Sequence, residues 1–537
     1  MGNYIKILAV AIVLVFAEQV LQIEAVACKD WLDVTPAGQA TESDLFSTGD
    51  GYRSVLNGLY KSMGKPELYG RNWSYGMLDC MAQLYNLESG SFNDEMCKAA
   101  AKYEYTNTQV SSSIESAWGI AYNIIANAND LLQNVENASN DIFAEGEMER
   151  KMITGEAYAC RALIHFELLR LFAPAPVNDD GRAYIPYIES YPVLSATKLG
   201  VKPVLEKVIA DLEKARGLVA VYDTTINGQG INLSGTGRFN NDFTYNSQTI
   251  SGQQIEDFDA ALIDDFFKGR GYRMSYNAVT ALLARVCQYA GRDQDAFNYA
   301  DEVVKAHVVF RDGSKNLMYK DDYSGLTQGW GNNEADFNNR KDYKTMSNLI
   351  FAAYNSLSYQ GTGSWLSADW KGGVSPNWFQ ISESYFSHGG VDEKSSDHRW
   401  NHMIFLGSGA YPVSAKYFIP TNLDTRDKTV NLFPVIRLTE MKYIMAEYYA
   451  RNGNVGEAYR ILNEIRENRG IYGSSLGGST WNEFEQELLH DARREWISEG
   501  QLFFLYKRLN AAIVNDKGTL RPMTLQESMF PVPADIK

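Results

Sequence analysis

This chain of 537 residues has little of three things: cysteine, long hydrophobic runs and positive charge. Its five cysteines are too few for the disulfide framework of a small secreted protein. After Ala17, no apolar stretch approaches the roughly 18 residues that a transmembrane helix needs. The net charge of −16 argues against a nucleic-acid partner, because basic residues supply most of the affinity for phosphate backbones. It also disfavours polyanionic ligands, so a neutral ligand fits the sequence better.

The hydrophobic run that the sequence does contain lies at its N-terminus, in residues 7–17 after Lys6. It is too short to span a bilayer and is typical of a secretory signal peptide. Small residues precede Cys28, as in a lipoprotein cleavage site. We therefore predict a signal peptide over residues 1–27 and a mature chain, 28–537, with a lipid on Cys28. An ordinary signal peptide followed by an incidental cysteine is the alternative.

Four cysteines remain in the mature chain if Cys28 carries a lipid. Cys160 and Cys287 lie within helical patterns, and we expect both to be buried as small apolar residues. Cys80 and Cys97 either pair or stay free, and the sequence leaves both alternatives open.

An internal repeat is the clearest signal for the fold. Residues 274–307 and 436–469 are 34 residues each, and apolar residues recur in both at intervals of three and four. This spacing gives each helix one apolar face. Gly291 and Gly453 occupy the same place in the two copies, where a helix end favours a positive φ. Each segment is predicted to be a helix–turn–helix of tetratricopeptide length, which must stack on others to bury its apolar face.

Further helices are predicted outside the repeat. Residues 113–137 and 148–172 resemble another pair, and residues 201–219 form an amphipathic helix. Thr480 and Glu483 match a capping box, which would start a helix that runs through Glu499 and stops or breaks at the glycine after it. These patterns predict a mostly α-helical protein.

Two segments lack a helical period. Residues 312–434 are rich in Gly, Asn, Ser, Asp and aromatic residues, and residues 222–254 are polar and rich in Gly and Asn. We expect both to be largely irregular. Long irregular segments inside a compact protein are usually functional or disordered, and the aromatic content of residues 312–434 argues against disorder.

Motifs along the mature chain resemble the SusD/RagB family, which comprises surface lipoproteins of Bacteroidetes. The N-terminal motif residues are Cys28, Asp30, Trp31, Leu32, Asp33, Pro36, Thr41, Glu42, Ser43 and residues 51–60. The second set is Gly155, Glu156, Ala157, Arg161, Ala162, His165, Phe166, Leu168, Leu171 and Phe172. The third is Ile436, Arg437, Leu438, Glu440, Ala446, Glu447, Ala450, Leu462, Asn463, Ile465, Arg466, Arg469 and Gly470. The fourth is Arg494, Glu495, Trp496, Glu499, Gly500 and Arg508, and the chain approaches its end with Phe530-Pro531-Val532-Pro533.

The resemblance implies a mostly α fold in which about four tetratricopeptide-like helical pairs carry a loop-rich, irregular ligand-binding part. It implies a lipid-anchored outer-membrane protein, facing the cell exterior, that binds glycans and delivers them to a SusC-like TonB-dependent transporter. No enzyme activity, cofactor, metal or nucleic-acid partner is expected. In this fold Arg494, Glu495, Glu499 and Arg508 resemble a structural ion network at the end of the helical stack.

Other chemistry receives little support from the sequence. Residues 473–477 match G-x-S-x-G, but a nucleophile elbow needs a strand before it, and here a helix precedes. His398 and His402 share a helical spacing, with Asp397 beside them, but a metal site would need a third ligand and an ordered helix. His165 lies on an apolar helix face and is expected to be a hydrogen-bonded core residue. A glycosidase-like pair of carboxylates is defined by separation in space and stays open.

Aromatic and polar residues in the irregular segments near 61–112 and 310–434 are the predicted ligand contacts. Sugar C–H faces pack on aromatic rings, and sugar hydroxyls need amide, carboxylate or guanidinium partners. One loop, residues 69–85, offers Arg71, Asn72, Trp73, Tyr75 and Tyr85. The other, residues 319–378, offers Trp330, Asn332, Asn333, Trp365 and Trp370. For each ring, burial in the core is the alternative. The competing functions are a surface glycoside hydrolase and a peptide- or glycopeptide-binding member of the same family.

Overall fold

A computed structural model describes most of this chain. The described residues are 42–88, 94–193, 195–233, 235–240, 249–250, 253–321, 323, 342, 344–358, 380–406, 412–417 and 431–533. The chain divides into two units, Met1–Tyr52 and Arg53–Lys537. In the first unit, α2 (Glu42–Leu45) leads to the start of α3 (Gly49–Met63). Within the described residues, no helix combines the length and apolar character needed to cross a membrane.

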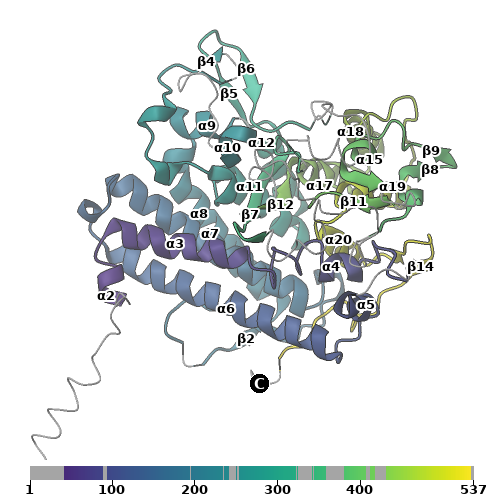
Figure 1. Cartoon of the computed structure of the whole chain (residues 1–537), viewed down its shortest axis with the longest axis horizontal. Coiled ribbons are helices and arrows are strands. Elements are labelled where there is room, and N and C mark those ends of the chain that lie inside the picture. Colours follow the sequence, from purple (N-terminus) through teal and green to yellow (C-terminus); the bar gives the residue numbers. More distant parts are fainter. Residues whose placement is uncertain are drawn as a thin grey trace, which may run out of the picture. The chain divides into compact units, whose positions relative to one another are not determined.

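The second unit is mostly helical, as the sequence predicts. Its longer helices are α6 (Thr108–Asn137), α7 (Gly146–Phe172), α8 (Val201–Asp223), α11 (Tyr276–Tyr289), α12 (Asp293–Val304), α17 (Leu438–Arg451), α18 (Val455–Asn468), α19 (Trp481–Glu495) and α20 (Gln501–Leu509). Its shorter helices are α4 (Met77–Met81), α5 (Glu95–Ala101), α9 (Ile226–Asn232), α10 (Gly235–Asn240) and α15 (His398–Met403). Helices consecutive in sequence pack together: α6 on α7, α7 on α8, α11 on α12 and α17 on α18 (Figure 1). Contacts of α8 with α11 and of α12 with α17 join these pairs into one stack.

Both copies of the predicted repeat are helical hairpins, α11–α12 and α17–α18. Gly291 and Gly453 lie in the turns with φ of 73° and 83°. A Cβ atom at either glycine would meet no atom within 4 Å, so the backbone angle rather than crowding favours glycine there. Ala284 and Ala446 are fully buried, which allows close packing of the helices.

Helix α7 is the most buried helix of the stack, and every residue from 152 to 172 is buried. Gly155 explains how closely α8 approaches it. A Cβ atom at this position would lie 2.8 Å from Val219 Cγ1 and 3.0 Å from the carbonyl oxygen of Ala215. The glycine of the second family motif is therefore required by helix packing.

The predicted helices over residues 113–137 and 201–219 are both longer in the structure. Helix α6 begins at Thr108, because the Asn107 side chain caps it by accepting hydrogen bonds from the backbone N–H groups of Gln109 and Val110. Helix α8 continues to Asp223.

The predicted continuous helix from Thr480 to Glu499 is wrong in its C-terminal part. The capping box of Thr480 and Glu483 is present and starts α19, but α19 ends at Glu495. Ser498 and Gly500 then adopt left-handed backbone angles, with φ of 64° and 74°, and α20 starts after them. The break turns the buried Glu499 carboxylate toward Arg437 and Lys416, 2.5 Å from a nitrogen of each.

The described strands are short and form two-stranded antiparallel sheets. The longest pair is β7 (Leu349–Tyr354) with β12 (Leu432–Arg437), and its register shifts after Pro434. The other pairs are β1 (Ile185–Pro186) with β2 (Lys198–Leu199), β3 (Thr249–Ile250) with β4 (Gln253–Gln254), β5 (His307–Val309) with β6 (Lys315–Leu317), β8 (Ser387–His388) with β9 (Val391–Asp392), β10 (Ile404–Leu406) with β11 (Pro412–Ser414), and β13 (Ile513–Val514) with β14 (Leu520–Arg521). Residues 312–434 thus contain strand pairs and the short helix α15.

The expectation that residues 222–254 are largely irregular is wrong for their first half. Helices α9 and α10 form there. The side chain of Thr225 caps α9 by accepting a hydrogen bond from the backbone N–H of Gly228. Local capping thus starts a helix in a Gly- and Asn-rich stretch that has no helical hydrophobic period.

Two predictions about buried residues are confirmed. Cys160 and Cys287 are fully buried in α7 and α11. His165 is also fully buried: its Nδ1 lies 2.9 Å from the carbonyl oxygen of Arg161, and its Nε2 accepts the backbone N–H of Ile188. Burial lowers the pKa of His165 to about 3, so the ring stays neutral at physiological pH.

Candidate functional site

The predicted ligand-binding loop, residues 69–85, lies inside the protein. Trp73, Tyr75 and Tyr85 are 2%, 1% and 3% exposed, and Asn72 is 7% exposed. The Tyr75 ring packs against that of Tyr417, with 4.4 Å between the ring centroids. As placed, these rings offer no open face to a ligand, and their contact with a glycan remains a prediction.

The loop is held against the break between α19 and α20. Tyr85 donates a hydrogen bond to Asp79 and lies 3.0 Å from the hydroxyl of Ser498. Asp79 accepts the backbone N–H of Gly500 at 3.0 Å. A Cβ atom on Gly500 would lie 2.4 Å from the carbonyl oxygen of Trp73. These contacts explain why the loop and the Glu499-Gly500 motif depend on each other.

Arg71, another predicted contact of this loop, borders an open cleft. It pairs with Asp94 at 2.5 Å, on a polar cleft of about 500 Å³ that Glu95, Gln109 and Ser113 also line. No aromatic residue is among the described lining residues of this cleft. The other predicted positions, Cys28, Trp330, Asn332, Asn333, Trp365 and Trp370, lie outside the described residues.

A larger cleft, of about 870 Å³, lies between α3, the 3-10 turn η5 (Arg270–Tyr272) and the end of β7. We call it the α3–β7 cleft. Its size falls within the range of small-molecule sites. Aromatic, amide and charged side chains share its lining. The described lining residues are Arg53, Asn57, Tyr60, Lys61, Phe239, Asp265, Phe266, Lys268, Gly269, Tyr272, Arg273, Tyr354, Asn355, Ser356 and Leu357.

A buried ion cluster binds side chains that line this cleft. Glu156 of α7 accepts hydrogen bonds from the Tyr60 hydroxyl at 2.6 Å, from Arg270 at 2.6 Å and from Arg273 at 2.8 Å. Burial alone would raise the pKa of Glu156, but Arg273 and Arg270 outweigh it and hold this pKa below its usual value. Arg270 also pairs with Asp223 at the end of α8. These bonds fix Tyr60 and the η5 turn in the cleft.

Three rings form one wall of the α3–β7 cleft. Tyr272 lies edge-on to Phe239 at 5.2 Å and to Tyr354 at 5.0 Å. Phe239 belongs to the core, whereas Tyr354, at the end of β7, is 41% exposed and Leu357 beside it is 55% exposed. The wall therefore passes from the core to an apolar surface that is open to solvent.

Most of the charged side chains that line the cleft are already paired. Arg53 forms a bidentate pair with Glu149 and lies 4.8 Å over the ring of Phe266. Lys268 pairs with Asp265. Asn57 and Lys61 are exposed on α3. Because most of the charges have partners, the cleft suits a neutral ligand with many hydroxyl groups.

Sequence reasoning missed this cleft as a site but named parts of it. Tyr354 and Leu357 fall in the predicted segment 310–434, and Phe239 in the stretch 222–254. Arg53 and Glu156 belong to the motifs that resemble SusD/RagB proteins. The missing signal was that Glu156 binds the turn that carries Tyr272, a contact between residues far apart in sequence.

The four residues predicted to form an ion network, Arg494, Glu495, Glu499 and Arg508, all form ion pairs, but Arg508 belongs to a separate pair with Glu447. The pairs are Arg494 with Glu393 and Asp397, Glu495 with Arg399 and Arg469, Glu499 with Arg437 and Lys416, and Arg508 with Glu447. Most of these groups are buried.

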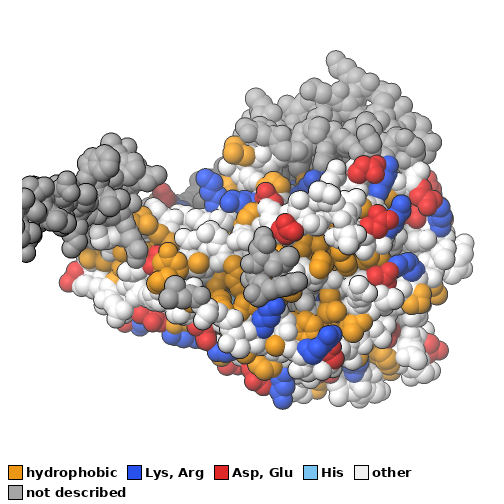
Figure 2. All heavy atoms as spheres, turned by 90° about the horizontal axis from the view of Figure 1, so that it is seen from below, with side chains coloured by type: hydrophobic (Ala, Val, Ile, Leu, Met, Phe, Trp, Pro, Cys, Tyr) orange, Lys and Arg blue, Asp and Glu red, His pale blue; other side chains and the backbone are white. Residues whose placement is uncertain are grey.

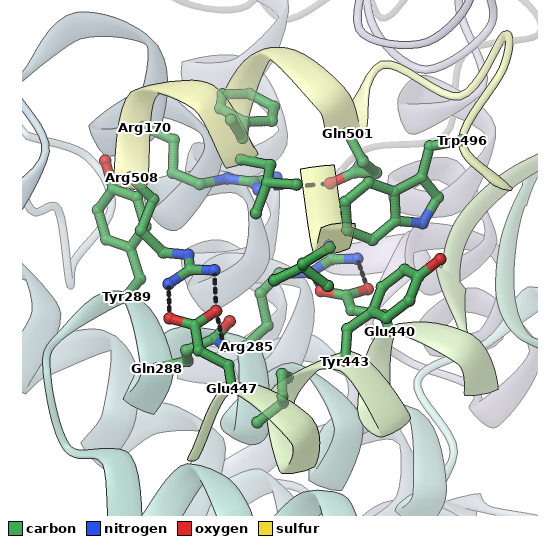
Figure 3. A pocket seen from close by; sticks show the side chains of 14 residues that line it. Arg170, Arg285, Gln288, Tyr289, Glu440, Tyr443, Glu447, Trp496, Gln501 and Arg508 are labelled. Atoms are coloured by element: carbon green, nitrogen blue, oxygen red, sulfur yellow. Dashed lines mark hydrogen bonds and ion pairs between the residues drawn. The ribbon is translucent and has the colours of Figure 1, made fainter. Parts of the chain in front are cut away.

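A small pocket lies beside this network, between α7, α11, α17 and α20. Figure 3 shows Arg508 paired with Glu447 and Arg285 paired with Glu440 in its walls. Its volume of about 40 Å³ has room for about one water molecule and none for a sugar ring. We assign it to the structural core.

The described geometry offers little for catalysis. Ser475 is exposed in a segment that follows α18 rather than a strand. His398 begins α15, and its backbone N–H donates to the carbonyl oxygen of Arg469. Among the described residues, no group of three or more His, Cys, Asp or Glu side chains is arranged to hold a metal ion.

On the face drawn in Figure 2, acidic and basic side chains are interspersed.

Comparisons with known proteins agree with the described fold. Residues 30–226 match the SusD-like family described as "starch-binding associating with outer membrane". A SusD-like protein P2 from Formosa agariphila is 26% identical over 199 residues, 37% of this chain. That match spans 36% of the relative's own length.

Solved structures share the fold over nine tenths of the chain. A SusD-like carbohydrate-binding protein from Bacteroides vulgatus superimposes with a TM-score of 0.60 at 16% identity, covering 91% of this chain and 95% of that one. A SusD superfamily protein from Bacteroides thetaiotaomicron has a TM-score of 0.58 at 21% identity, covering 90% and 93%. One from Bacteroides fragilis has a TM-score of 0.61 at 16% identity, covering 92% and 98%. Residues 30–226 are therefore similar to the SusD-like family, and the chain shares the fold of solved SusD superfamily proteins.

Proposed function

We propose that this protein binds neutral oligosaccharides in the α3–β7 cleft and neither makes nor breaks bonds in them. The observation that carries the proposal is the pair Tyr272 and Tyr354, whose rings pass from the core to the open surface. Aromatic faces pack on sugar C–H groups. The exposed side chains of Asn57 and Lys61 on α3 supply polar partners for hydroxyl groups.

Binding fits the cleft better than hydrolysis does. A glycosidase places two carboxyl groups on either side of the scissile bond. Asp265 is the sole carboxylate among the described residues that line the cleft, and it pairs with Lys268. Glu156 lies beneath the lining, fully buried and bonded to three donors. Neither group is placed as a free acid facing a second carboxylate.

We propose further that Cys28 carries a lipid that holds the protein on the outer membrane, facing outward. There it would pass captured glycans to a SusC-like TonB-dependent transporter. The signal-peptide pattern and the family's association with the outer membrane support this part. Exchanging Cys28 for alanine should release the protein from the membrane fraction, and retention of the variant there would contradict the anchor.

The test of function is isothermal titration of the mature chain against a panel of neutral oligosaccharides and peptides, with an assay for new reducing ends. We expect binding to at least one oligosaccharide at micromolar to millimolar affinity and no turnover. Sustained release of reducing ends would identify a glycoside hydrolase. Binding to peptides alone would identify a peptide-binding member of the family.

A further inference from the structure

The chain that leaves β7 forms the open edge of the α3–β7 cleft, and we call residues 354–358 the β7 rim. Tyr354 and Leu357 of the rim line the cleft and are 41% and 55% exposed. A segment that leaves a strand into solvent has few buried apolar contacts, so it opens easily unless its polar groups are bonded. The bonds that hold the β7 rim therefore decide how the Tyr354 ring faces a ligand.

Asn355, which lies between the two exposed residues, holds the rim with both ends of its side chain. Its Nδ2 group donates a hydrogen bond to the carbonyl oxygen of Gly64, just after α3, at 2.9 Å. Its Oδ1 atom accepts the backbone N–H of Leu357, also at 2.9 Å. The first bond joins the rim to the end of α3 across 291 positions of the sequence, and the second fixes the turn that carries Leu357.

The backbone of Asn355 adds a third attachment. Its N–H donates to the carbonyl oxygen of Asn431, the residue before β12, at 3.0 Å, and its carbonyl oxygen accepts the N–H of Ser358 at 3.1 Å. The Ser358 hydroxyl in turn donates to Oδ1 of Asn431 at 2.9 Å. The end of α3, the rim and the approach to β12 are thus all bonded to Asn355.

Gly64 allows α3 to approach the rim this closely. A Cβ atom at this position would overlap the carbonyl oxygen of Tyr354 and would lie 3.4 Å from the Asn355 Cβ. Any side chain there would push α3 and the rim apart. The contact therefore sets the spacing between the Tyr354 ring and the polar groups of α3, Asn57 and Lys61, across the cleft.

We propose that Asn355 is a positioning residue of the α3–β7 cleft, which holds the ring of Tyr354 in place before a ligand arrives. Both ends of the Asn355 amide are already bonded within the protein, so Asn355 acts through Tyr354 rather than on the sugar. A ligand that meets an ordered rim loses less affinity to the ordering of the protein. The inference rests on the proposed function, because it assigns this order to glycan binding.

Asn463 in α18 provides a matched control. Its Nδ2 donates to the carbonyl oxygen of Leu476 at 2.9 Å, and its Oδ1 accepts the N–H of Leu476 at 2.8 Å. Like Asn355 it is half-buried, and it is outside the described lining of the cleft. Replacing either asparagine by alanine removes one donated and one accepted side-chain bond, but only Asn355→Ala disturbs the rim.

The first test is a double-mutant cycle on affinity. The probe is the tightest-binding member of a neutral panel that includes maltoheptaose, cellohexaose and xylohexaose. We expect Asn355→Ala to weaken binding about fivefold and Asn463→Ala to leave it unchanged. In the Tyr354→Ala background, Asn355→Ala should cost about twofold or less, because the ring that it positions is gone.

The outcomes of this cycle are distinguishable. Equal affinities of Asn355→Ala and the unaltered chain would overturn the role of Asn355 and leave glycan binding intact. Fully additive losses would show that Asn355 does not act through Tyr354 and would also overturn the proposal. Absence of binding by the whole panel would overturn the proposed function, and the role of Asn355 in binding with it.

A second measurement needs no glycan. Backbone hydrogen exchange, followed by mass spectrometry of peptides that contain the β7 rim, should be about tenfold faster in Asn355→Ala and unchanged in Asn463→Ala. If Asn355→Ala does not fold, Asn355→Asp takes its place, because it loses the bond to Gly64 and keeps the acceptor for Leu357. Unchanged exchange in the rim, or an equal increase throughout the chain, would overturn the proposal.

Discussion

The helical stack and the α3–β7 cleft both contain paired charges, but the cleft also has aromatic rings next to open space. In the stack, arginines such as Arg469 and Arg494 are fully buried against carboxylates and leave no group for a ligand. In the cleft, the charges are paired beneath or beside the ligand space, and the rings of Tyr272 and Tyr354 face it. The charged residues of the motifs that resemble SusD/RagB proteins therefore build the scaffold, while the two proposed ligand-binding rings, Tyr272 and Tyr354, lie in segments without a motif.

Breaking the buried network should have the largest effect on stability. Glu495 accepts bonds from Arg399, Arg469 and Tyr323, so Glu495→Gln leaves two buried guanidinium groups without full compensation. We expect the free energy of unfolding in urea to fall by about 3 to 5 kcal/mol. The control is Glu457→Gln, because Glu457 pairs with the exposed Arg460 and should change stability by less than about 1 kcal/mol. Equal losses of unfolding free energy in the two variants would contradict the role of Glu495 in the buried network.

The buried network should also make the free energy of unfolding depend on pH in the acidic range. Burial would raise the pKa of Glu495, but Arg469 and Arg399 outweigh it and hold the pKa well below its usual 4.5. A carboxyl group with a depressed folded pKa contributes stability that is present above the unfolded pKa and lost as pH falls toward the folded one. We expect unfolding free energy to be steady above about pH 5 and to fall below about pH 4.5. In Glu495→Gln this acid-dependent part should shrink, and an unchanged profile would refute the role of Glu495.

Arg238 is buried, and none of the described carboxylates pairs with it. It donates to the carbonyl oxygens of Asn232, Met318 and Met346, and burial lowers its pKa to about 10, so it stays charged at neutral pH. Arg238→Met should lower stability by about 2 to 3 kcal/mol, because buried carbonyl groups lose their donors. Thermal and urea unfolding would measure the loss, with the half-exposed Arg292→Met as control. A loss no larger than that of the control would contradict this account.

The cleft should show the reverse pattern, a loss of binding with little loss of stability. Tyr354 is 41% exposed, so Tyr354→Ala should weaken oligosaccharide binding about tenfold while leaving the fold nearly as stable. Tyr472, which is 74% exposed and outside the described lining of the cleft, provides the control as Tyr472→Ala. Titration calorimetry measures the oligosaccharide affinity of both variants. Equal affinities would show that the cleft is not the binding site.

The smallest predicted effect tests the hairpin turns. Gly453 has a φ of 83°, which disfavours any side chain, so Gly453→Ala should cost about 1 kcal/mol. Gly456 lies in the first turn of α18 with no atom within 4 Å of an added Cβ, so Gly456→Ala should be neutral or slightly stabilising. In urea unfolding, we expect Gly453→Ala to lower the free energy of unfolding and Gly456→Ala to leave it unchanged or raise it slightly. An unchanged free energy in Gly453→Ala would contradict the turn geometry.

Local patterns predicted the scaffold well. The apolar spacing around Ala284 and Ala446 gave the hairpins, and the Thr480–Glu483 capping box gave the start of α19. The end of α19 could not be predicted, because it depends on Glu499 reaching Arg437 and Lys416, which are distant in sequence.

The site was harder to predict for the same physical reason. Trp73 and Tyr354 both lie in segments rich in aromatic and polar residues, yet one is buried and the other is open. The difference arises from what packs on each ring: Trp73 adjoins the Gly500 turn, whereas Tyr354 ends a strand beside the cleft. Composition alone cannot distinguish these outcomes.

The most direct test of glycan binding at the α3–β7 cleft is a crystal structure of the mature chain with an oligosaccharide selected by titration. We predict a sugar ring packed on Tyr354, with its hydroxyl groups near Asn57 and Lys61 and its glycosidic bonds intact. A sugar bound elsewhere with the cleft empty, or a cleaved sugar in the cleft, would contradict the account.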